Sequence, residues 1–107
     1  DQPWPVRWSA ISLMGKVQSR ELLNHLMKVL ETDECWIVRM EAAKVISDIS
    51  KNSKPNPKIG KMLIGLLKNE EWIEVKIIII KSLANFQISK KSYFYILVFL
   101  NTYQECN

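Results

Sequence analysis

The amino-acid sequence predicts an all-α protein built as one continuous array of about six helices. Three observations support this prediction. A short motif recurs three times along the 107 residues, apolar residues recur at helical spacing after each copy, and only 3 glycines and 4 prolines are present. An all-β sandwich needs many Gly- and Pro-rich turns, so that fold class is excluded. The apolar content of 48% and charged content of 24% are typical of a folded domain.

The recurring motif joins an acidic residue to a basic one. Its three copies are DQPWPVR at residues 1–7, DECWIVR at 33–39 and EEWIEVK at 70–76. In each copy five residues separate the acid from the Arg or Lys, and a valine precedes the base. The second copy follows the first by 32 residues, and the third follows after a further 37. Self-similarity at such a period indicates a repeat architecture.

Each copy of the motif leads into a stripe of apolar positions spaced four, three and four residues apart. This spacing follows one face of an α-helix, which we interpret as the face turned toward the core. The three stripes are Val6, Ala10, Leu13 and Val17; Val38, Ala42, Val45 and Ile49; and Val75, Ile79, Ser82 and Phe86.

Six helices follow from these stripes and from the apolar segments between them. We expect them near residues 5–17, 19–31, 36–50, 58–68, 72–87 and 90–103. Asp1, Asp33, Ser19 and Ser89 stand at helix starts, where such side chains cap the first turn. Asn69 ends the fourth helix, and the segment KNSKPNP at 51–57 breaks the chain before it. Because the links are short, neighbouring helices should pack antiparallel.

The segment from Val38 to Ile46, preceded by Asp33 six positions before Arg39, resembles a HEAT repeat. The period and the Asp-x-x-Trp-x-Val-Arg opening are similar to the short HEAT repeats of phycobilisome lyases. The resemblance covers nearly the whole chain. It implies a right-handed, armadillo-like α–α superhelix in which residues 1–107 form a single array of about three repeats. The helices near 5–17, 36–50 and 72–87 are then the second helices of their repeats, and those near 19–31, 58–68 and 90–103 are first helices.

The resemblance also implies roles for the motif residues. In the family, the acid and the base form ladders along the stacked repeats, and the acid caps the second helix. These roles fall on Asp1, Asp33, Glu70, Arg7, Arg39 and Lys76. The third copy departs from the pattern, because Glu and Lys replace Asp and Arg, and four isoleucines at 77–80 replace an alanine pair.

The last predicted helix is apolar nearly all round from Tyr93 to Leu100. Such a helix needs cover on more than one side, whereas a terminal repeat normally has a polar outer face. The array also begins with the second helix of a repeat. We therefore expect a piece of a longer solenoid, with further repeats or another chain covering this helix.

Residues capable of catalysis or metal binding are sparse. His25 is the single histidine and is followed by Leu26 rather than the Glu of iron-binding HEAT-like enzymes, and Cys35 and Cys106 lie 71 residues apart. We predict no catalytic, metal or cofactor site. Two free thiols are typical of a reducing compartment, so we expect an intracellular, cytoplasmic protein. The longest apolar run is too short to span a membrane, so no membrane partner is expected.

The leading functional hypothesis is a non-catalytic protein-interaction or scaffold module with an extended surface. Opposite the core stripe, Trp8, Met40 and Ile77 form a candidate partner-binding ridge, flanked by Lys44 and Lys81. Two alternatives remain open. One is a fragment of a HEAT-like enzyme. The other is a nucleic-acid-binding module, since residues 49–104 carry a net charge of +6 and residues 1–48 carry −1. For the motif tryptophans Trp4, Trp36 and Trp72, packing between helices is favoured over ligand stacking.

Overall fold

The computed structural model describes residues 2–54, 56–86 and 89–101, and all regular structure within them is helical. The all-α prediction is therefore confirmed. The elements are α1 (Trp4–Val17), the short 3₁₀ helix η1 (Arg20–Leu22), α2 (Leu23–Thr32), α3 (Trp36–Lys51), α4 (Pro57–Asn69), α5 (Ile73–Leu83) and α6 (Lys90–Asn101).

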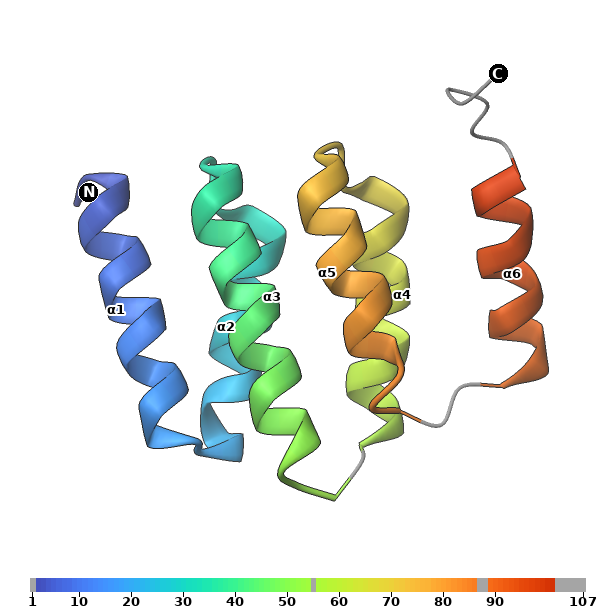
Figure 1. The fold of residues 1–107 in the computed structure, drawn as a ribbon, viewed down its shortest axis with the longest axis horizontal. Helices are drawn as coiled ribbons and strands as arrows, with labels where there is room; N and C mark the ends of the chain where they lie inside the picture. Colours follow the sequence, from blue (N-terminus) through green and yellow to red (C-terminus); the bar gives the residue numbers. More distant parts are fainter. Residues whose placement is uncertain (1, 55, 87–88, 102–107) are drawn as a thin grey trace.

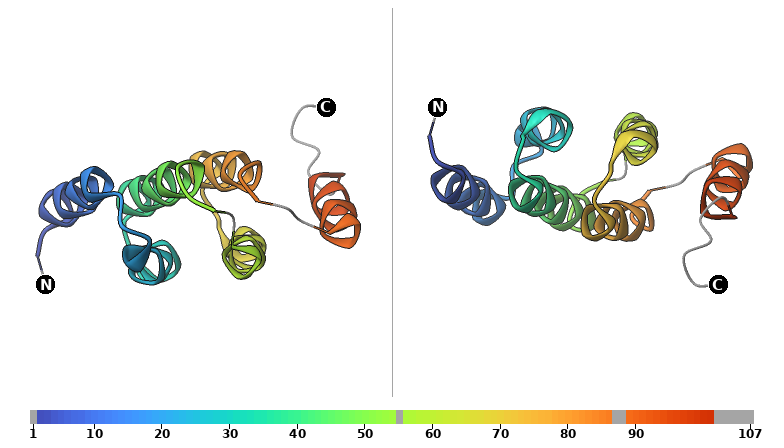
Figure 2. Two further views of the ribbon diagram at one scale, coloured as in Figure 1. Left: turned by 90° about the horizontal axis from the view of Figure 1, so that it is seen from below. Right: turned by 90° about the horizontal axis from the view of Figure 1, so that it is seen from above.

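The helices form two layers of a solenoid (Figure 1). Helices α1, α3 and α5 run in the same direction in one layer, and α2 and α4 run oppositely in the other (Figure 2). Helix α3 is central, because it contacts α1, α2 and α5. Helix α6 lies at the opposite end of the array from α1 and runs in the direction of α2 and α4 (Figure 1).

Helix boundaries differ from the predicted ones where local hydrogen bonds decide the backbone. The predicted helix near 19–31 starts with a 3₁₀ turn, where the Ser19 hydroxyl accepts a bond from the Glu21 N–H at 3.3 Å. Helix α4 starts at Pro57, and the Asn56 side chain caps it by accepting from the Lys58 N–H at 3.0 Å. Helix α5 ends at Leu83, and residues 84–86 continue in turns. The predicted ends at residues 87 and 103 lie outside the described residues.

The core follows the predicted stripes of α3 and α5. The seven stripe residues on these two helices are buried, as is Phe86 just after α5, and Val38 and Ala42 are fully inaccessible to solvent. Opposite them, α2 and α4 bury apolar residues of their own: Leu23, Leu26, Met27 and Leu30, and Ile59, Leu63, Ile64 and Leu67. Each helix pair therefore buries its apolar faces by stacking on its neighbours.

The stripe of α1 departs from this pattern, and the expectation that it faces the core is wrong. Val6, Leu13 and Val17 are 49%, 62% and 64% exposed, and Ala10 is exposed as well. The physical reason is that no described helix packs on α1 in the position that α2 takes on α3. Helix α1 is instead held through its other side, where Ile11 is buried and Gly15 closely approaches Val45 of α3.

Candidate functional site

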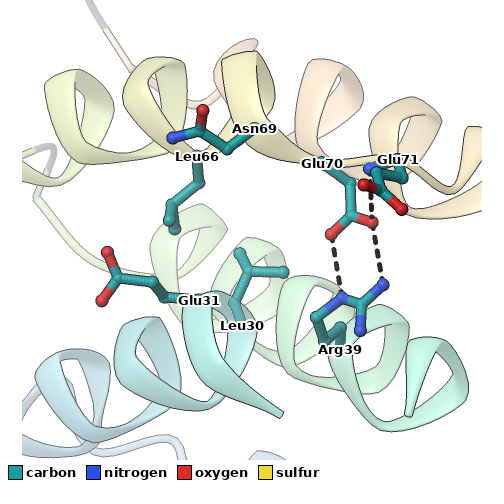
Figure 3. A pocket seen from close by; sticks show the side chains of 7 residues that line it. All are labelled: Leu30, Glu31, Arg39, Leu66, Asn69, Glu70 and Glu71. Atoms are coloured by element: carbon teal, nitrogen blue, oxygen red, sulfur yellow. Dashed lines mark hydrogen bonds and ion pairs between the residues drawn. The ribbon is translucent and has the colours of Figure 1, made fainter. Parts of the chain in front are cut away.

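Two arginine–carboxylate pairs join successive repeats at the edge where α2 and α4 end. Arg7 of α1 donates from Nε and Nη2 to the two carboxylate oxygens of Asp33, at 2.8 and 2.9 Å. Arg39 of α3 donates from the same two atoms to the carboxylate of Glu70, both at 3.0 Å (Figure 3). Both contacts are bidentate, a geometry that fixes orientation as well as adding energy. The base of one repeat thus binds the acid of the next.

The same carboxylates also order the turns before α3 and α5. Asp33 Oδ1 accepts from the Cys35 N–H at 2.9 Å, and Glu70 Oε2 accepts from the Glu71 and Trp72 N–H groups at 3.0 Å. Arg39 donates from Nη1 to the backbone carbonyl of Asp33 at 2.8 Å, so it binds its own repeat as well as the next. Each acid therefore satisfies backbone donors just ahead of a helix, where no helical partner exists.

The expected ladder roles of Asp1 and Lys76, at the two ends of the array, are not tested by the contacts described. Asp1 lies outside the described residues. Lys76 occupies on α5 the position that Arg7 and Arg39 occupy on α1 and α3. The ladder roles of Asp1 and Lys76 stay predictions.

The carboxyl group of Asp33 is acidified by its surroundings. Burial raises the pKa of Asp33. Hydrogen bonds from Arg7 and from the Cys35 N–H, together with the charges of Arg7 and Arg39, lower the pKa and outweigh the effect of burial. The net result is a pKa below the ordinary value for aspartate. The pKa of Arg7 is raised, chiefly by the same hydrogen bond to Asp33. The pair is therefore ionised at neutral pH.

Asp33 is not the N-cap of α3, which is Cys35 without a side-chain cap bond, so the expected capping role is wrong. Replacing Asp33 with alanine should still lower the free energy of unfolding by about 1–2 kcal/mol at pH 7, because the charged hydrogen bonds from Arg7 and from the Cys35 N–H are lost. Because the folded-state pKa of Asp33 is lowered, its stabilisation is complete above the unfolded-state pKa of about 4 and is lost as the pH falls through the folded-state value. Urea unfolding at pH 7 and at pH 2.5 measures both effects.

The difference in free energy of unfolding between wild type and Asp33→Ala should be smaller at pH 2.5 than at pH 7. The neighbouring exposed acid Glu34 supplies the control, and Glu34→Ala should change stability little at either pH. A gap of equal size at both pH values would contradict the role given to the ionised carboxylate.

The tryptophans lie along the same edge as the ion pairs. Trp36 and Trp72 stack with ring centroids 4.9 Å apart and an interplanar angle of 21°. Trp36 packs against the core, whereas Trp72 is 44% exposed and Trp4 is 43% exposed. The sequence places each tryptophan at a corner between helices, but it did not predict that the Trp36 ring stacks on the Trp72 ring of the next repeat.

The candidate ridge lies on the layer formed by α1, α3 and α5. Trp8 and Ile77 are 36% and 46% exposed, whereas Met40 between them is partly buried against the core. The flanking lysines Lys44 and Lys81 are both exposed. The side chains at the two ends of the candidate ridge are thus open to solvent, whereas the middle one is partly covered, and the ridge stays a prediction.

Two polar contacts between repeats were missed by sequence reasoning. Asn85, after α5, donates to the Ser47 hydroxyl of α3 at 3.1 Å, and Asn52, after α3, donates to the Gln18 side chain after α1 at 3.1 Å. Three of these residues follow a second helix, where helical periodicity carries no signal. Gln18 directly follows its stripe, Asn52 comes three residues after Ile49, and Asn85 precedes Phe86, so no common sequence position could have singled them out.

Basic side chains gather along the edge opposite to the ion pairs. The links after α1, α3 and α5 all fall on this edge, because successive helices alternate in direction (Figure 1). The exposed basic residues here are Lys16, Arg20, Lys51, Lys54, Lys58, Lys90 and Lys91, with Glu21 and Asp48 as exposed acids. We call this set the basic edge. The residues of the basic edge come from both halves of the chain. Positive charge is therefore concentrated at one edge of the array as well as in the C-terminal half of the sequence.

His25 is exposed on α2, beside Val29 in a hollow between α1 and α2. Among the residues described, no group of three or more His, Cys, Asp or Glu side chains is placed to hold a metal ion. Within the same residues, each helix is too short or too polar to cross a membrane.

Comparisons with known proteins agree with the repeated geometry. The sequence profile of HEAT repeats matches residues 1–84, which include all three motif copies and the whole of α5. No curated protein sequence and no solved structure gives a significant match. The match covers more than half of the chain and confirms the resemblance drawn from the Val38–Ile46 segment. The chain therefore belongs to the HEAT-repeat family.

Proposed function

We propose that this chain is a protein-binding module that presents the layer of α1, α3 and α5 to a protein partner. HEAT repeats generally mediate protein–protein interaction, and the family is typically non-enzymatic. The observation that carries the proposal is the exposure of Trp8 on α1 and Ile77 on α5, together with the exposed Lys44 of α3 and Lys81 of α5.

The physical argument rests on what these side chains contribute in the free chain and in a complex. A large apolar side chain that is one-third to one-half exposed adds little to the solenoid's own core. The same side chain, once desolvated at the centre of an interface, can contribute about 2 kcal/mol or more. Met40 is partly buried already, so its share in binding should be smaller than that of Trp8 or Ile77. The lysines beside the ridge should act chiefly on the association rate and its salt dependence.

Replacing Ile77 with serine should weaken binding of the partner about 30-fold, which corresponds to about 2 kcal/mol, while the fold is retained. The double variant Met40→Ser/Ile77→Ser should bind only slightly less than Ile77→Ser alone. Isothermal titration of a partner captured with the chain measures the affinity, and circular dichroism checks the fold.

Leu13→Ser provides the matched control, because Leu13 is 62% exposed but lies on a different side of α1 from Trp8. Its affinity should equal that of wild type. If Leu13→Ser weakens binding and Ile77→Ser does not, the partner surface lies elsewhere.

A second candidate, a nucleic-acid-binding module, draws support from the basic edge. Basic side chains near three successive links lie on one edge of the array, and contacts of Lys and Arg with phosphates supply most of a nucleic-acid binder's affinity. Binding to single-stranded RNA that falls steeply with salt, and falls further in Lys54→Gln/Lys58→Gln, would favour this candidate. Affinity independent of salt would exclude it.

A further inference from the structure

Two adjoining hollows lie between α2 and α4, in the middle of the array. One, of about 230 Å³, lies where both helices end, and the other, of about 290 Å³, lies nearer to their starts. The hollows share Glu31, Leu66 and Asn69, so together they form one groove, which we call the α2–α4 groove. Because α1 precedes α2 and α5 follows α4, a helix stacked on either end of the array would not fill the space between them.

The floor of the α2–α4 groove is apolar. Met27 and Leu30 of α2 are each only 2% exposed, and Leu66 of α4 is partly buried against the core. Met62 is 37% exposed, and Gly65 leaves further room, since a Cβ atom placed there would have no neighbouring atom within 4 Å. Methionine side chains adapt to apolar surfaces of different shape, so this floor suits the apolar side chains of a docked segment.

The groove carries unbalanced negative charge where α2 and α4 end. Three carboxylates and one guanidinium line this hollow, a net charge of −2 in a chain whose formal charge is +4 (Figure 3). The guanidinium is already engaged, because Arg39 binds Glu70 and the backbone carbonyls ahead of α3. Within the part of the chain that the structure describes, the exposed carboxylates of Glu31 and Glu71 take part in no hydrogen bond or ion pair. Both carboxylates are therefore available to a cation.

The helix ends add to this negative charge. The C-terminal carbonyl groups of α2 and α4 meet at the groove, and such helix ends favour a positive charge nearby. Helix α2 has no basic residue in its last turn. The basic residue in the last turn of α4 is Lys68, whose Nζ lies 4.3 Å from the centre of the Tyr95 ring on α6. A cation from a partner would thus meet two helix ends as well as two unpaired carboxylates.

We propose that the α2–α4 groove binds a basic amphipathic helix of a partner protein. A helix that lays its apolar face into a groove is a recurring mode of peptide recognition. The apolar side chains of the partner would pack on Leu66 and over Gly65. An arginine or lysine would lay its apolar stem on Leu30 and place its charged group at the acidic end, beside Glu31 and Glu71. An acidic segment or a nucleic acid would be repelled by the same carboxylates. The groove lies on α2 and α4, so it is separate from the candidate ridge on α1, α3 and α5.

The test measures fluorescence anisotropy of a labelled helical peptide, with leucines on one face and arginines on the other, as the full chain is added. Wild type should bind this peptide about 10-fold more tightly than the same peptide with glutamate in place of arginine. Glu31→Gln/Glu71→Gln should weaken binding of the arginine peptide about 10-fold, because two ion pairs are lost. The matched control is Glu21→Gln/Asp48→Asn, which removes the same charge from exposed acids at the opposite edge and should bind as wild type does.

Gly65→Lys tests the groove in a second way. The new side chain would occupy the open space over the floor and place a cation of the chain's own beside Glu31. Lysine also has a higher helix propensity than glycine, so thermal unfolding should show an equal or higher melting temperature while peptide binding weakens about 10-fold. Gly65→Ala raises helix propensity without filling the groove, and its affinity should match wild type. Ile77→Ser should also bind the peptide normally, which separates this site from the ridge.

Four results would overturn the proposal. Equal affinity of wild type for the arginine and glutamate peptides would show that the carboxylates select nothing. Equal weakening in Glu31→Gln/Glu71→Gln and in the control double variant would assign the effect to net charge alone. Peptide binding that is lost in Ile77→Ser but kept in Gly65→Lys would place the peptide on the ridge. A wild-type chain that self-associates, and that becomes monomeric in Glu31→Gln/Glu71→Gln, would show that the basic edge of a second copy occupies the groove.

Discussion

Replacing Arg39 with alanine should lower the free energy of unfolding by about 3 kcal/mol, because it leaves a buried carboxylate without its ionic partner. The side chains of Arg39 and Glu70 are only 13% and 6% exposed, so water cannot solvate the stranded charge well. The change also removes the hydrogen bond from Arg39 to the Asp33 carbonyl. Urea unfolding at pH 7 measures the loss.

The repeat supplies the control for this experiment. Arg7→Ala removes the equivalent arginine from α1, where the side chain is 35% exposed and solvent screens the pair more strongly, so its cost should be clearly smaller. Arg39→Lys should fall between wild type and Arg39→Ala, because an ammonium group cannot reproduce the two parallel bonds. Equal losses in Arg7→Ala and Arg39→Ala would argue against burial as the source of the effect.

Replacing Ala42 with leucine should lower the free energy of unfolding by about 1–3 kcal/mol. Ala42 is fully inaccessible in the stripe of α3, and α3 packs closely against α2. A leucine there must push the helices apart or adopt a strained rotamer. Thermal unfolding should show the loss as a reduced melting temperature.

Ala10→Leu is the matched control, because Ala10 holds the corresponding position on α1 and is exposed. It should change stability by no more than about 0.5 kcal/mol. An unchanged melting temperature in Ala42→Leu would mean that α3 can rotate or shift to accept the larger side chain.

Helix order and the repeat pattern could be predicted because both depend on local spacing. The four-three-four stripe defines a helix face wherever it occurs, and the motif copies mark which helices are equivalent. The resemblance to HEAT repeats implied ladder roles for Arg39 and Glu70, but which acid binds which base came from the structure, which pairs these two residues across 31 positions. Helix ends were less predictable, because a 3₁₀ turn at Arg20–Leu22 and the turns after Leu83 depend on a few hydrogen bonds.

The sequence by itself determined which residues are chemically suited to a core, a ladder or a ridge. It could not determine which of these positions are covered, because burial depends on whether a second helix reaches them. Val6, Ala10, Leu13 and Val17 have the same pattern as Val38, Ala42, Val45 and Ile49, yet only the stripe of α3 is buried, since α2 packs on it. Met40 and Ile77 likewise occupy equivalent positions, and Met40 is the more buried because α5 lies beside α3. The tertiary structure alone decided these outcomes, and with them which apolar faces stay open to a partner.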